Sequence, residues 1–196
     1  IISSDLTLTK GEFRIGSNTL TLNGSLSYTQ GSLLGGNSSN LTIGGSSTTL
    51  TLPSVTLNNF ILNRVNGANM NGAVTILGNT TLTNGTLTIG ANSLSLTNIP
   101  TRTSGKLDAS NTFSTLILNN TTPGTLPASL FTSTINNLTL NGSGGITASE
   151  NMTVNGLINL AYNNPSSTKG ALDMGNYTLY LGVTSRFIGI GDVTGR

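Results

Sequence analysis

The stretch Thr81–Asn98, TLTNGTLTIGANSLSLTN, alternates apolar and polar residues and has glycine or asparagine wherever the alternation stops. Such alternation in short runs predicts β-strands that bury one face. Glycine and asparagine adopt positive φ angles at low cost, so they predict the turns between these strands. The pattern continues through most of the chain, and no window shows apolar residues at helical spacing. The sequence therefore predicts an all-β protein with no long helix.

Part of this stretch recurs twice elsewhere in the chain. GEFRIGSNTLTL at 11–22 and GALDMGNYTLYL at 170–181 align without a gap to GTLTIGANSLSL at 85–96. Apolar residues keep their positions in the alignment, whereas the residues between them vary, so we expect the apolar set to face the interior. That set is Phe13, Leu87 and Leu172; Ile15, Ile89 and Met174; Leu20, Leu94 and Leu179; Leu22, Leu96 and Leu181.

The recurrence indicates a single repetitive domain over residues 1–196. A second pair of similar segments, LNNFILN at 57–63 and INNLTLN at 135–141, supports units that are several coils long. The predicted units are about 1–24, 25–98, 99–182 and 183–196, the first and last being partial.

Two architectures fit short strands in repeated units. In a parallel β-solenoid, coils of about 20 to 25 residues stack about 4.8 Å apart, and like side chains form ladders. In a string of β-sandwiches, each unit would form its own hairpin-built domain around a larger core. Aromatic residues are only 5% of the chain, and an insertion such as the one around Asn163 can loop out of one coil. We therefore predict a parallel β-solenoid (β-helix) of about eight or nine coils, forming a rod about 40 Å long.

The composition excludes several classes of protein. Charged residues are only 7% of the chain, and the eight basic and six acidic residues are spread singly, which predicts no surface for nucleic acid. No apolar run approaches the roughly 20 residues that span a bilayer. The chain begins IISSDLTL with neither an initiator methionine nor a signal sequence, so we expect it to be processed or cut from a longer polypeptide.

The residues that most often carry catalysis are missing. The sequence has neither histidine nor cysteine, which serve as bases, activated nucleophiles and zinc ligands. Glycosidases and β-helix pectin-cleaving enzymes need clustered carboxylates instead, and the repeat alignment brings no two acidic residues into one column. We therefore predict no catalytic residue, no metal site and no cofactor. The acidic residues are Asp5, Glu12, Asp108, Glu150, Asp173 and Asp192.

Pairs of threonines separated by one residue suggest an alternative function. Each pair would stand on one strand face, and stacking at about 4.8 Å would repeat it in a regular array. Such arrays organise water for ice binding in some solenoids. Threonine also has a high β-propensity, so an exposed strand face uses it without any ligand. The candidate residues for ice binding are Thr19, Thr21, Thr49, Thr51, Thr81 and Thr83.

Two further residue types bear on ligands. Asparagines at turns predict a ladder of amides that hydrogen bond from coil to coil; they are Asn58, Asn59, Asn136 and Asn137. Tyrosines could stack on a sugar ring; they are Tyr28, Tyr162, Tyr177 and Tyr180. A carbohydrate-binding or carbohydrate-cleaving β-helix is therefore a second alternative.

The segments LTLTNGTLTIGANSLSLTN and NLTIGGSSTTLTLPSVTLNNFILNR resemble the repeats of very large secreted surface proteins of Bacteroidetes-type bacteria. Those repeats look like right-handed parallel β-helix adhesins or fibres. The resemblance implies an extracellular or cell-surface array with no catalytic residues. We accordingly expect a non-catalytic structural or adhesive segment of a fibre, stalk or coat. Its expected partners are adjoining repeats or copies of itself, joined end to end, and surface carbohydrate.

Overall fold

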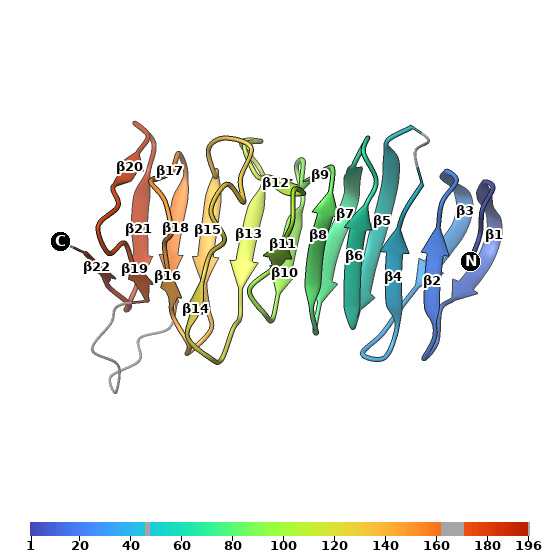
Figure 1. Cartoon of the computed structure of the whole chain (residues 1–196), viewed down its shortest axis with the longest axis horizontal. Coiled ribbons are helices and arrows are strands. Elements are labelled where there is room, and N and C mark those ends of the chain that lie inside the picture. The colour runs from blue at the N-terminus through green and yellow to red at the C-terminus, as the bar shows by residue number, and fades with distance from the viewer. Residues whose placement is uncertain (46–47, 162–170, 196) are drawn as a thin grey trace.

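A computed structural model describes residues 1–45, 48–161 and 171–195 and shows a parallel β-solenoid (Figure 1). All strand pairings within these ranges are parallel, and paired residues on neighbouring coils lie 18 to 29 positions apart. The described residues include no α-helix. The predicted solenoid is thus confirmed, and hairpin-built sandwiches are excluded. The insertion around Asn163, with Tyr162, lies outside the described residues.

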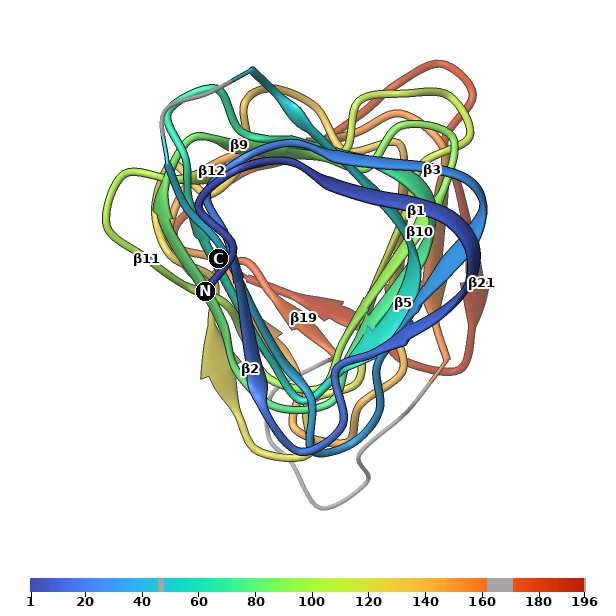
Figure 2. The ribbon, with the colours of Figure 1, turned by 90° about the vertical axis from the view of Figure 1, so that its right-hand side faces the viewer.

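The view along the axis shows that each coil has three sides (Figure 2). Nine strands of the described residues lie on what we call the first side, so the chain makes about nine coils. They are β2 (Thr19–Leu22), β4 (Asn40–Ile43), β6 (Asn59–Asn63), β8 (Thr80–Asn84), β11 (Thr101–Arg102), β14 (Gly124–Thr125), β16 (Ile146–Thr147), β19 (Leu172–Asp173) and β22 (Val193–Thr194).

The other two sides follow the first in each coil. In the early coils, one long strand runs along both sides in turn: β1 (Leu6–Arg14), β3 (Leu26–Leu34), β5 (Leu50–Leu57) and β7 (Ala68–Ile76). Later coils use a separate strand for each side. The second side then holds β9 (Thr86–Thr88), β12 (Lys106–Asp108), β17 (Met152–Val154) and β20 (Leu179–Leu181). The third side holds β10 (Ser93–Leu96), β13 (Thr115–Leu118), β15 (Asn137–Leu140), β18 (Leu157–Leu160) and β21 (Arg186–Gly189).

Aliphatic ladders fill the interior of the coil. One ladder on the third side consists of residues in register from coil to coil, all of them buried: Leu57, Ile76, Leu96, Leu118, Leu140 and Leu160. Each buried leucine or isoleucine contributes about 1.5–3 kcal/mol to the free energy of unfolding. Of the apolar set taken from the repeat, Leu181 differs from expectation, since its side chain is 50% exposed. It lies in β20, near the end of the stack, where no described coil covers it.

The three copies of the repeat occupy three different corners of the coil. The first copy joins β1 to β2, the second joins β9 to β10, and the third joins β19 to β20. A glycine with positive φ makes the bend in each copy: Gly16 at 63°, Gly90 at 61° and Gly175 at 56°. The motif therefore encodes a corner, and its copies do not stack on one another: Leu87, for example, pairs with Ala68 and Leu107.

Side-chain hydrogen bonds close two of these corners in the same way. Asn18 donates from Nδ2 to the carbonyl oxygen of Ile15 at 3.2 Å, and Asn92 donates to that of Ile89 at 3.0 Å. Asn92 also donates to the carbonyl of Met70 on the preceding coil at 2.9 Å. The asparagine thus fixes the turn and, in the second copy, links it to its neighbour.

Candidate functional site

A groove lies on the first side, away from the ends of the stack. It has a volume of about 410 Å³ and crosses β2, β4, β6 and β8. Strand alternation forms its walls, because Leu41 and Ile43 point into the core while Asn40 and Thr42 point outward. The lining residues are Thr19, Asn40, Leu41, Thr42, Asn59, Ile61, Asn79 and Thr81.

One wall belongs to a row of asparagines, which we call the amide row: Asn40, Asn59, Asn79 and Asn98, of which the first three line the groove. The Nδ2 of Asn59 donates to Oδ1 of Asn40 at 2.9 Å, and the backbone N–H of Asn79 donates to Oδ1 of Asn59 at 2.8 Å. The Nδ2 of Asn98 donates to Oδ1 of Asn79 at 3.2 Å. Each amide of the row is therefore hydrogen bonded to a neighbouring coil.

The predicted asparagine ladder is found here in part. Asn58 also donates to Oδ1 of Asn40, at 3.3 Å, so the predicted residues Asn58 and Asn59 both belong to an amide ladder. Asn136 and Asn137 instead donate to backbone carbonyls of the preceding coil, those of Thr112 and Ser114. All four link neighbouring coils, but only the first two do so through another amide.

A second row of side chains runs along the groove beside the amide row. Register places Thr21, Thr42, Ile61, Thr81 and Thr101 in one outward column. Ile61 interrupts the hydroxyls and is 37% exposed, so its aliphatic side chain lies open on the groove. The Thr101 hydroxyl donates to that of Thr81 at 3.3 Å. The column thus consists of hydroxyl groups with one apolar side chain, Ile61, between Thr42 and Thr81.

The groove carries no formal charge, because every residue that lines it is neutral. A neutral surface of amides, hydroxyls and methyl groups attracts neither phosphate nor a metal ion strongly. The groove therefore offers a ligand hydrogen-bonding groups and aliphatic surface but no charge.

The structure separates the six threonines that the sequence nominated for ice binding. Thr19, Thr21, Thr81 and Thr83 lie on the first side. However, Thr81, the first residue of its pair, lies in the column of Thr21, the second residue of the other pair. Asn40, not a threonine, pairs with Thr19 on the next coil. The pairs Thr19/Thr21 and Thr81/Thr83 are therefore offset from one another along the strands. Thr83 falls at a register shift between β6 and β8, where Leu62 pairs with Leu82 and Asn63 with Asn84.

The other two candidates belong to a different side. Thr51 lies in β5 and pairs with Asn69, and Thr49 precedes β5 and donates from its hydroxyl to the carbonyl of Asn66 at 2.9 Å. Both are exposed. The six candidates thus form no single array.

Carboxylates do not gather within the described residues, which contain no group of three or more acidic side chains placed to hold a metal ion. Glu12 pairs with Arg14 on the surface. Glu150 accepts a hydrogen bond from the backbone N–H of Ser129 at 2.8 Å. The carboxylate of Asp5 accepts one from the backbone N–H of Ser25 at 2.9 Å, and this bond lowers the pKa of Asp5.

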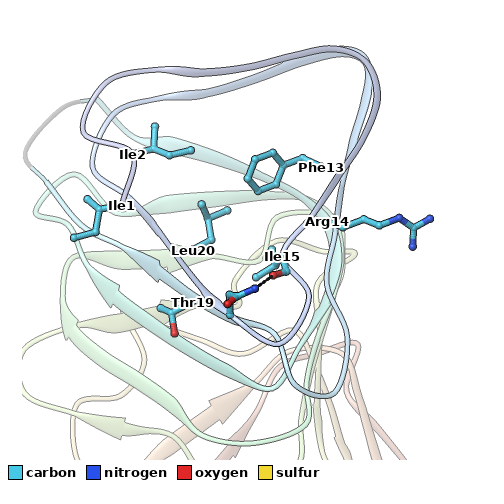
Figure 3. A pocket seen from close by; sticks show the side chains of 8 residues that line it. Ile1, Ile2, Phe13, Arg14, Ile15, Thr19 and Leu20 are labelled. Carbon is cyan, nitrogen blue, oxygen red and sulfur yellow. Dashed lines mark hydrogen bonds between the residues drawn. The ribbon is translucent and has the colours of Figure 1, made fainter.

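Apolar hollows lie at both ends of the described stack. At the N-terminal end, Ile2, Phe13 and Leu20 surround a hollow of about 300 Å³, with Arg14 turned outward (Figure 3). At the other end, Leu160, Phe187 and Val193 border a hollow of about 240 Å³. Exposed large apolar side chains are frequent in this last part: Tyr177, Tyr180, Leu181, Val183, Phe187, Ile188, Ile190 and Val193.

Sequence reasoning missed Asn40, Asn79 and Ile61 as residues of the groove. Their signal was available, since each stands at an outward position of a predicted strand or at the turn before it. Comparisons with protein-family models, with curated proteins and with solved structures found no match. Among the described residues, no helix is long and apolar enough to cross a membrane.

Proposed function

We propose that this chain is a non-catalytic segment of an extracellular fibre, stalk or surface coat, with adhesive contacts made by its sides. The observation that carries the proposal is the stack of parallel coils around one aliphatic core. Strand hydrogen bonds run along the axis of such a stack, so stretching or bending it requires many bonds to break together. That arrangement suits a stiff spacer.

The ends of the stack support growth by addition of coils. Outermost strands offer unpaired backbone groups that template pairing with another strand. The hollows bordered by Phe13 at one end and Phe187 at the other add apolar surface to both templates. The proposed partners are therefore adjoining repeats of the same polypeptide or further copies of this chain.

Immunogold labelling of intact source cells tests the location. We expect antibodies against the solenoid to label fibres or a coat on cells that have not been permeabilised. Labelling that appears only after permeabilisation would contradict the proposal. Release of reducing ends from any polysaccharide by the purified chain would overturn its non-catalytic part.

Ice binding is the second candidate. Thr21 and Thr42 are in register on neighbouring coils, as are Thr81 and Thr101, so two short threonine runs do stack on the first side. Thermal hysteresis of the purified chain measures this function directly. A freezing-point gap that a Thr42→Lys substitution removes would support it, and the absence of any gap would exclude it.

A further inference from the structure

We infer that the groove on the first side binds a neutral, extended, β-linked polysaccharide that lies along the solenoid axis. The inference rests on the proposed adhesive function and names its ligand class and its residues. Three features of the groove support it: the free donors of the amide row, the apolar surface of Ile61 and the absence of charge.

In two side-chain amides of the row, the Nδ2 group makes no hydrogen bond to the described residues. The Oδ1 atoms of Asn40 and Asn79 accept hydrogen bonds from neighbouring coils, but their Nδ2 groups donate none to the described residues. Both asparagines line the groove. Asn79 is exposed and Asn40 is half-buried. An amide N–H that reaches the groove in a fixed position is a ready donor to a sugar hydroxyl.

The spacing of these donors fits a polymer. Asn40, Asn59 and Asn79 stand on three successive coils, so Asn40 and Asn79 are separated by about 9.6 Å, twice the spacing of neighbouring strands. That distance is close to the length of one disaccharide in an extended β-linked chain. A polysaccharide along the axis could thus present equivalent hydroxyls to both amides.

The second row supplies the apolar part of the contact. Sugar rings have faces of C–H groups that pack against aliphatic side chains. Ile61 stands in the column between the threonines Thr42 and Thr81, whose methyl groups extend the apolar surface. A sugar lying between the two rows would contact amides on one edge and methyl groups on its face.

The shape and charge of the groove argue against other ligands. An anionic polymer would find no cation among the lining residues, and each of them is neutral. Ice presents a flat lattice, whereas this surface contains a groove of about 410 Å³ and so does not match a flat face. A neutral polymer narrow enough to enter the hollow satisfies both conditions.

The test compares polysaccharide binding by the 196-residue chain and by a double variant, Asn40→Asp with Asn79→Asp. Aspartate keeps the Oδ1 acceptors that hold the row together but removes both Nδ2 donors. Asn69→Asp is the matched control, because Asn69 is exposed on β7, away from the groove. The probes are hydroxyethyl cellulose as the neutral β-linked chain, dextran for α-linkage and alginate for negative charge, each measured by isothermal titration calorimetry.

We expect the unmodified chain and the Asn69→Asp variant to bind hydroxyethyl cellulose, and the double variant to bind it about tenfold more weakly or worse. Melting curves by circular dichroism establish that all three chains are folded. If the double variant melts early, Ile61→Asn replaces it, since that change removes only the apolar contact. Equal binding by all folded variants, equal binding of dextran or alginate, or no binding of hydroxyethyl cellulose would each overturn the inference. None of these outcomes bears on the labelling of fibres at the cell surface. The polysaccharide inference and the proposed function can therefore fail separately.

Discussion

Arg64 is the largest fully buried side chain of the described residues, in a protein with very few charges. Its guanidinium donates to the carbonyl oxygens of Thr48 at 2.8 Å, Asn23 at 3.0 Å and Gly24 at 2.5 Å. These carbonyls belong to two earlier coils, so one side chain ties three coils together at the corner between the first and second sides. Burial lowers the pKa of the guanidinium, but the carbonyl dipoles stabilise its charge.

Replacing this side chain should therefore destabilise the protein strongly. Arg64→Met fills much of the same volume but leaves several buried carbonyls without a donor, which should lower the free energy of unfolding by about 3 kcal/mol or more. For a domain of this size that corresponds to a melting temperature about 6–12 °C lower. Differential scanning calorimetry measures the change. The matched control is Arg14→Met, which removes an exposed arginine and a surface ion pair worth less than about 1 kcal/mol. Equal melting temperatures for the two variants would contradict the role given to Arg64.

Asp5 makes a smaller contribution that depends on pH. The hydrogen bond from the Ser25 backbone lowers its pKa below the ordinary value of 3.8, because it stabilises the ionised carboxylate. The folded state then binds the proton less tightly than the unfolded state, so the contribution is present above pH 3.8 and disappears as the pH falls through the lowered pKa.

Asp5→Asn should accordingly lower the melting temperature at neutral pH and leave it unchanged in strong acid. Melting curves of both chains between pH 2 and pH 7, measured by circular dichroism, would show the two midpoints converging as the pH falls. Asp192→Asn is the control, since no described residue hydrogen bonds to its carboxylate. A difference between wild type and Asp5→Asn that is constant across this range would refute the pKa argument.

At the scale of elements, the corner motif depends on its glycine. Gly90 has a φ of +61°, a conformation that costs an L-residue with a Cβ about 1–2 kcal/mol. Gly36, by contrast, has open space around the Cβ position and is not in the left-handed region. The two glycines therefore separate backbone strain from the general effect of replacing a glycine.

Gly90→Ala should lower the melting temperature by about 2–4 °C for each kcal/mol of strain, whereas Gly36→Ala should leave it unchanged or raise it slightly. The same calorimetric measurement serves for both. If both substitutions have the same effect, the bend does not require a positive φ. Gly16→Ala extends the comparison to the equivalent corner of the first copy.

Strands and core were predictable from the sequence because they follow from local alternation. Ile89, Leu94 and Leu96 are buried as expected, and no longer-range information was needed to place them. The register between coils was not predictable. The register depends on the number of residues in the turns of each coil. Paired residues on neighbouring coils of the first side are 21, 19 and 20 positions apart in the sequence.

Small changes in coil length explain why the candidate site differs from expectation. A shift of two residues keeps a side chain on the outer face but moves it to the next column. Thr19 consequently lies beside Asn40, and Thr81 takes the column of Thr21. Similarly, the repeat was recognisable as sequence, but its three copies lie at three different corners, because the motif encodes a bend that can join any two successive sides. The unit boundaries stay a prediction.

At the scale of the whole molecule, the sides and the ends of the solenoid differ in chemistry. The sides are mostly polar with few charges, and parallel strand pairing joins most of their neighbouring coils. The last coils instead expose apolar side chains: Phe187 is 45% exposed although its register partner Ile158 is fully buried. Phe187 thus occupies a core position of the stack with no described coil above it.

If the ends mediate association, a charge at this position should prevent it. Phe187→Glu would place a carboxylate in the apolar hollow, and a second stack could then dock only by burying that charge unpaired, which is strongly unfavourable. We expect sedimentation velocity to show concentration-dependent oligomers for the unmodified chain and monomers for the variant, with electron micrographs showing rods in place of longer filaments. Phe113→Glu is the control, because Phe113 is 74% exposed in the turn before β13, away from the ends. Loss of association in both variants would show that exposed apolar side chains promote association wherever they lie. Association that persists in both variants would show that the sides of the solenoid make the contact, through their hydroxyl and amide groups.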